Sequence, residues 1–153
     1  MQTLVWTIYI FTLLYCLFDD VKNREIHLYA LIVLGGSSLY LGYIQMPIQK
    51  VFLLNMMSNV LFLGLQYLGL MMYLQLRYKE GKVLFKKWIG IGDLLFFLVI
   101  LPKYDFSSYL FIYLGCLIFT AIIFLVYKTK LKTIPLAGLS ALFIVLFECY
   151  QCL

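Results

Sequence analysis

Six long apolar stretches, separated by short polar segments, set the pattern of the chain. They lie near residues 2–18, 27–46, 51–76, 88–101, 106–127 and 134–150. Their apolar residues are continuous rather than alternating, which is typical of membrane-spanning helices and not of barrel strands. The fourth stretch has about 14 residues, fewer than the roughly 20 of an ordinary span. We therefore predict six transmembrane helices, the fourth of them short.

Composition narrows the class of protein further. Hydrophobic residues make up 65% of the 153 residues and charged residues only 12%, against about 25% charged residues in soluble domains. The N-terminal segment has neither a basic region nor a small-residue cleavage site, so we expect an uncleaved first helix. The sequence predicts a single all-α integral membrane domain over residues 1–153.

The positive charges are distributed unevenly between the predicted loops. The first, third and fifth loops hold ten of the 12 basic residues: Lys22, Arg24, Arg77, Lys79, Lys82, Lys86, Lys87, Lys128, Lys130 and Lys132. The second and fourth hold only Lys50 and Lys103. Because cytoplasmic loops are enriched in Lys and Arg, both termini are predicted outside and the basic loops in the cytoplasm. The basic residues behind the net charge of +5 then lie beside the anionic lipid headgroups of the cytoplasmic face. The sequence contains no aromatic stacking platform that would indicate a nucleic-acid partner.

The cysteines give little sign of metal or redox chemistry. Cys16 and Cys116 lie inside apolar stretches and are expected to be buried packing residues. Cys149 and Cys152 have the spacing of a redox or metal pair, but no second pair or histidine lies near them in sequence, and whether they form a disulfide stays open. Close helix contacts are expected at three glycines within the spans: Gly64, Gly69 and Gly115.

Two acidic sites lie at the edges of predicted spans. Asp19 and Asp20 end the first span, and Asp93 begins the fourth, directly after Gly90-Ile91-Gly92. A charged side chain at the bilayer centre costs at least about 2.5 kcal/mol, so a functional role is the default hypothesis. The predicted topology brings Asp20 and Asp93 to the same, cytoplasmic depth, where they can face each other.

A pair of close carboxylates has a chemical use, because the two tend to share one proton. The ionised member can take a proton from water as the water attacks a peptide carbonyl, and the protonated member can donate one. This is aspartic proteolysis, which needs no metal and no cofactor. Gly90 and Gly92 would let the backbone approach a substrate closely. The alternatives are an aspartate favoured by a helix N-terminus and a solvated interfacial pair at Asp19 and Asp20.

These residues resemble the type IV prepilin peptidases and preflagellin peptidases, the Gly-x-Gly-Asp intramembrane aspartic proteases. The first family motif is matched by Asp20-Val21-Lys22-Asn23-Arg24-Glu25-Ile26, which selects Asp20 over Asp19, and the second by Gly90-Ile91-Gly92-Asp93. Lys132-Thr133-Ile134-Pro135-Leu136-Ala137 is loosely similar to the stretch that opens the family's last helix. The resemblance implies Asp20 and Asp93 as catalytic residues, with Gly90 and Gly92 supporting the motif.

The resemblance also implies a substrate and a location. The substrate would be a prepilin-like or pseudopilin membrane protein, cut at the cytoplasmic face between its basic leader and its hydrophobic helix, and the peptidase would be a multi-pass protein of the inner (plasma) membrane. The loop after Asp20 is too short for the methyltransferase segment of the large members. Two departures are Leu95, where the family usually has lysine, and His27-Leu28 in place of Pro-Asn. His27 could orient the site or simply begin the second helix.

Two other functions remain open. One is a noncatalytic scaffold or assembly subunit of a pilus or secretion system that keeps the fold, with Leu95 and His27 as marks of drift. The other is a small transporter, which is disfavoured because the second, third and fifth spans carry no charge in their middles.

Overall fold

All secondary structure in the described part of the chain is helical. The computed structural model describes residues 2–23, 26–46, 48–78, 91–127 and 136–151. The elements are α1 (Gln2–Asn23), α2 (Leu28–Gln45), α3 (Gln49–Tyr78), α5 (Ile91–Ile100), the 3-10 turn η1 (Leu101–Lys103), α6 (Phe106–Tyr127) and α7 (Leu136–Gln151). Each of the six predicted stretches contains one α-helix, which confirms the all-α prediction.

Four of these helices are long and apolar enough to cross a membrane. They are α1, α2, α6 and the Gln49–Tyr73 part of α3. The described lengths of α7 and α5 are 16 and 10 residues, which correspond to about 24 and 15 Å of helix. The fold is therefore that of a membrane-embedded helical protein, and six complete crossings remain a prediction.

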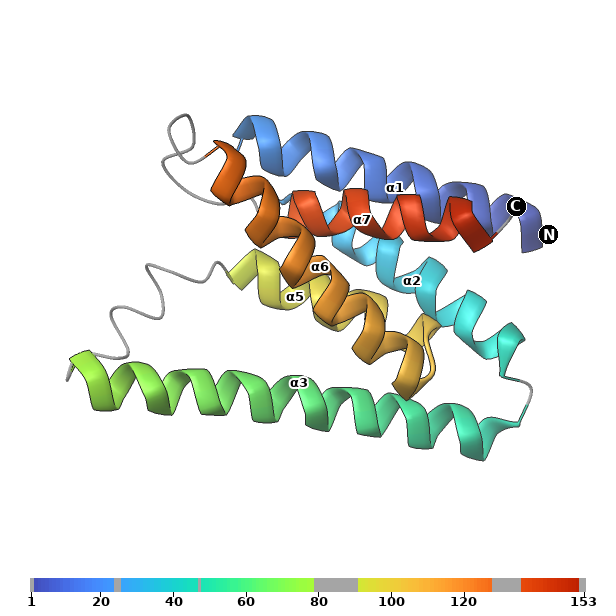
Figure 1. The fold of residues 1–153 in the computed structure, drawn as a ribbon. Coiled ribbons are helices and arrows are strands. Elements are labelled where there is room, and N and C mark those ends of the chain that lie inside the picture. The colour runs from blue at the N-terminus through green and yellow to red at the C-terminus, as the bar shows by residue number, and fades with distance from the viewer. Residues whose placement is uncertain (1, 24–25, 47, 79–90, 128–135, 152–153) are drawn as a thin grey trace.

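The helices are arranged with α1 and α3 on opposite sides of the molecule. In Figure 1, α1 lies along α7, α5 and α6 occupy the middle, and α3 lies beyond them. The start of α1 and the end of α7 lie together at one end of the molecule, whereas the end of α1 and the starts of α5 and α7 lie at the other. This arrangement brings the three segments that carry the candidate site to one end.

A continuous apolar core joins the helices. Its largest fully buried hydrophobic side chains are Tyr9, Tyr109, Phe96, Phe97, Leu13, Leu34, Leu41, Ile100, Leu101, Ile112 and Ile144. The turn after α5 is held by polar contacts as well. Ser38 Oγ donates a hydrogen bond to Val99 O at 2.5 Å, and Asn59 Nδ2 donates to Tyr104 O at 3.0 Å. The first bond joins α2 to the last turn of α5, and the second joins α3 to the residue after η1. Together they fix the direction of α5.

The three glycines expected at close helix contacts behave differently. A Cβ added at Gly115 would lie 2.5 Å from Phe143 Cζ, so the close contact between α6 and α7 is confirmed. At Gly64 and Gly69 an added Cβ would meet nothing within 4 Å in the described part of the chain. The expectation is wrong at these two positions, because α3 stands away from its neighbours there.

Candidate active site

Asp20 lies in the last turn of α1 and points at the first turn of α7. Its side chain is only 7% exposed, and its Oδ2 accepts a hydrogen bond of 2.6 Å from the backbone N–H of Gly138. The first amides of a helix have no partner within the helix, so they are available to a carboxylate from another element. Asp20 is thereby bound to an element 118 residues away in sequence.

Asp93 binds the same end of α7, but it does so from α5. It lies in the first turn of α5, is half-buried, and its Oδ1 accepts a hydrogen bond of 3.0 Å from the N–H of Ala137. Ala137 and Gly138 are consecutive, so the two aspartates bind adjacent amides of one helix N-terminus. The structure places these two sequence-predicted residues together, at an end of α7 that favours negative charge.

Gly138 permits the close approach of α1 to α7. A Cβ at this position would lie 3.0 Å from Asp20 Oδ2, 3.1 Å from Asp20 Cβ and 3.3 Å from Leu17 O. All three distances are tighter than ordinary van der Waals contact. The hydrogen bond between Asp20 and Gly138 therefore depends on the absence of a side chain at residue 138.

The two glycines of the Gly-x-Gly-Asp motif contribute less that can be described. Gly90 lies outside the described residues. Gly92 belongs to the first turn of α5, and a Cβ added there would lie 3.8 Å from Ile26 Cδ1, an ordinary contact. Packing within the described part of the chain does not require glycine at residue 92.

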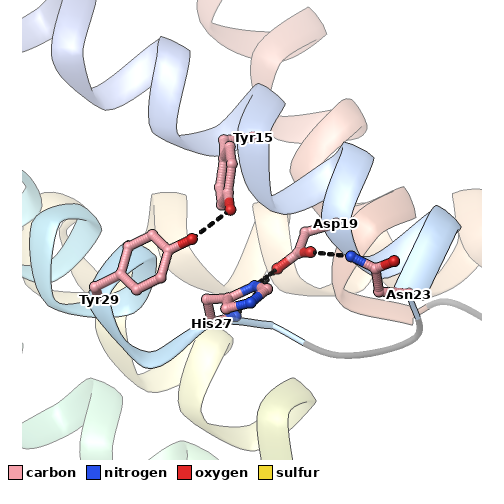
Figure 2. Close-up of polar contacts among 5 residues, drawn as sticks. All are labelled: Tyr15, Asp19, Asn23, His27 and Tyr29. Atoms are coloured by element: carbon pink, nitrogen blue, oxygen red, sulfur yellow. Dashed lines mark hydrogen bonds and ion pairs between the residues drawn. The ribbon is translucent and has the colours of Figure 1, made fainter.

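Asp19 binds Asn23 and His27, at the connection between α1 and α2 (Figure 2). Its Oδ1 accepts a 2.7 Å hydrogen bond from Asn23 Nδ2, and its Oδ2 accepts a 3.1 Å bond from the N–H of His27 and pairs with His27 Nδ1. Beside this cluster, the hydroxyls of Tyr15 and Tyr29 lie 2.5 Å apart. Asp19 is thus placed as a structural residue.

The structure shows the surroundings of His27 and Leu95, two residues that depart from the family pattern. His27 is the residue before α2 and its ring is bound to Asp19, in line with the interpretation as a helix-entry histidine. Leu95 is half-buried and packs against the apolar core. A leucine at residue 95 therefore serves packing, where the family's lysine would carry a charge.

A second buried polar cluster occupies the other end of the molecule. Lys103 Nζ lies 2.5 Å from Glu148 Oε1 and 4.2 Å from the ring centroid of Tyr9, and the Lys103 side chain is 2% exposed. Tyr104 also donates to Glu148, and Trp6 Nε1 donates to it at 3.4 Å. Burial raises the pKa of the Tyr104 phenol well above its usual range, so the phenol keeps its proton and remains a donor.

The cysteines fit the packing interpretation where they are described. Cys16 and Cys116 are buried thiols, and Cys116 Sγ donates to Ser140 O at 3.7 Å. Cys149 is exposed on α7, and Cys152 lies outside the described residues.

Three features of the candidate site and of the second polar cluster could not be identified from the sequence. The amides of Ala137 and Gly138 are backbone groups, and the only signal for them was Pro135 followed by small residues at a helix start. Lys103 lies in the connection between α5 and α6, as predicted, but the sequence did not indicate that its side chain is buried against Glu148. Glu148 itself carried no motif.

The fold and its long apolar helices define a helical membrane protein. Comparisons with protein-family models, with curated protein sequences and with solved structures each gave no match to this chain.

Proposed function

We propose that this protein is an intramembrane aspartic endopeptidase that cleaves the basic leader of prepilin-like or pseudopilin substrates. The observation that carries the proposal is the meeting of Asp20 and Asp93 on the adjacent amides of Ala137 and Gly138. Two carboxylates from separate helices, gathered at one helix end, form the arrangement that acid–base hydrolysis of a peptide needs. The matching motifs at Asp20 and Asp93 supply the substrate class.

The proposal includes six membrane crossings, with both termini outside and the basic loops in the cytoplasm of a plasma-membrane protein. An even number of crossings accords with the start of α1 and the end of α7 lying together in Figure 1. Of the two basic residues predicted in the outer loops, Lys103 is buried, and Lys50 lies in the first turn of α3, where it is exposed. The contrast in positive charge on which the orientation rests is correspondingly greater.

The proposed reaction uses the two carboxyl groups in opposite protonation states. The ionised one accepts a proton from water as the water oxygen bonds to the scissile carbonyl carbon, and the other donates its proton to the carbonyl oxygen. Collapse of this intermediate breaks the C–N bond, one of its hydroxyl groups returns a proton to the carboxylate that had donated one, and the leaving nitrogen takes up the proton first removed from water. The amides of Ala137 and Gly138 hold both groups in position throughout.

Cleavage of a tagged reporter by the protein in bacterial membranes tests the proposal. The reporter carries a short lysine-rich leader, a glycine at the cut position and an apolar helix. We expect Asp20→Asn and Asp93→Asn each to slow cleavage by about 10²- to 10⁴-fold, the usual contribution of a general acid or base. Asp19→Asn is the matched control, because it makes the same change one residue away at a carboxylate that binds the α1–α2 turn.

Two results would contradict the assignment. Full cleavage by either Asp20→Asn or Asp93→Asn removes that residue from the mechanism. Binding of the reporter by the wild type without any cleavage favours the noncatalytic scaffold, which the packing of Leu95 into the core makes the second candidate. Mass spectrometry of the reporter locates the cut and measures both products.

A further inference from the structure

A mostly apolar groove runs between α3 and the middle of the molecule and ends beside the candidate site. Its volume is about 540 Å³, and its lining residues are Gln66, Tyr67, Gly69, Leu70, Tyr113, Leu117 and Leu136. The first four come from α3, the next two from α6 and the last from the start of α7. In Figure 1, α3 lies on the opposite side of α5 and α6 from α1.

The groove reaches the start of α7, the helix end that binds the two aspartates. Leu136, which lines it, directly precedes Ala137, whose amide binds Asp93. A chain lying in the groove would therefore have one end at the carboxylates.

Polar groups in the wall indicate which kind of chain fits. A peptide bond must leave its helix to be hydrolysed, and inside a bilayer its freed N–H and C=O groups then need new partners. The side-chain amide of Gln66 offers both a donor and an acceptor at this point of an otherwise apolar wall. A lipid acyl chain cannot form a hydrogen bond with either group.

We propose that this groove binds the apolar segment of the substrate that follows the cleaved bond, and that Gln66 hydrogen-bonds its unwound first turn. The inference rests on the proposed endopeptidase function. It assigns substrate recognition to the second half of α3, a region that no motif marks. Gln66 is a specificity residue in this scheme, and the aspartates perform the chemistry.

Two glycines of α3 allow a matched test. An added Cβ meets nothing within 4 Å in the described part of the chain at either Gly69 or Gly64, so a side chain can begin at both positions without a clash. Only Gly69 lines the groove. Five residues along a helix correspond to a rotation of about 140°, so Gly64 faces elsewhere. Gly69→Leu is expected to slow cleavage of the reporter by about tenfold or more by filling the groove, and Gly64→Leu to leave it unchanged.

A cross-linking arm measures docking without catalysis. In an Asp93→Asn background, Gly69→Cys is expected to form a disulfide with a cysteine in the first turn of the reporter's apolar helix, whereas Gly64→Cys is not. Thermal unfolding in detergent checks that all variants remain folded.

The outcomes separate the two proposals. Cross-linking at Gly69 without cleavage by the wild type keeps the groove and overturns the peptidase. Wild-type cleavage with equal rates for Gly69→Leu and Gly64→Leu, and equal cross-linking at both positions, overturns the groove and leaves lipid as its occupant. If the wild type does not cleave the reporter and the Gly69→Cys protein in the Asp93→Asn background does not cross-link to it, both proposals fail.

Discussion

Replacing Gly138 with alanine would place a methyl group against the carboxylate of Asp20. The added carbon would lie 3.0 Å from Asp20 Oδ2 and 3.3 Å from Leu17 O. Neither α1 nor α7 can yield freely, because the two helices pack along each other. We expect Asp20 to move by a few tenths of an ångström or more, which lengthens its 2.6 Å bond to the Gly138 amide.

The size of the effect follows from that bond. A hydrogen bond to a charged group is worth about 1.5–3 kcal/mol, and each 1.4 kcal/mol corresponds to about tenfold in rate. We expect Gly138→Ala to slow reporter cleavage by about 10- to 100-fold. Stability should change less, because overpacking costs about 1–3 kcal/mol while alanine is favoured over glycine in a helix by about 1 kcal/mol.

The assay is single-turnover cleavage of the reporter in detergent, paired with thermal unfolding of the same preparations. Gly36→Ala on α2 is the control, since an added Cβ at Gly36 meets nothing within 4 Å. Wild-type cleavage by Gly138→Ala would show that activity does not depend on the Asp20–Gly138 contact. A loss of cleavage equal to the loss of folded protein would reduce Gly138 to a folding residue.

Three further outcomes follow from the described contacts. Lys103→Met leaves the buried Glu148 carboxylate without its cation, so we expect a loss of about 3–5 kcal/mol in the free energy of unfolding. Lys103→Met combined with Glu148→Leu should recover most of that loss, and equal destabilisation of the single and double variants by denaturant titration would contradict a buried ion pair. Gly92→Ala should leave the unfolding temperature equal or higher, because within the described part of the chain its Cβ would contact only Ile26, at 3.8 Å. A lower unfolding temperature for Gly92→Ala would show that the fold itself needs the glycine. His27→Ala should lower the unfolding temperature while cleavage persists, because the ring that is removed binds Asp19. Loss of cleavage in a folded His27→Ala protein would show that His27 takes part in the active site.

The helices were predictable because lipid leaves a long apolar segment few alternatives. Each of the six apolar stretches could satisfy its backbone only as a helix, and each contains one. The shared end of Asp20 and Asp93 also followed from the order of spans. The direction of each side chain did not: Asp19 and Asp20 are neighbours, yet one binds the α1–α2 turn and the other binds α7.

What the sequence could not supply were contacts made by groups without a sequence signature. The amide of Gly138 is a backbone atom, and its availability depends on where α7 begins. Lys103 and Glu148 are 45 residues apart, and only the packed fold brings Nζ and Oε1 to 2.5 Å. The open space beside Gly69 is likewise a property of how α3 stands, since glycine in a span predicts close packing more often than a groove.

Under the proposed function, the length of α3 would link membrane thickness to substrate specificity. Its apolar portion, Gln49–Tyr73, has 25 residues and so measures about 37 Å, against a hydrocarbon core of about 30 Å. A helix of this excess length fits by leaning, and it leans further in a thinner bilayer. Because α3 provides one wall of the proposed substrate groove, the lipids around the protein would set the groove's width as directly as its side chains do.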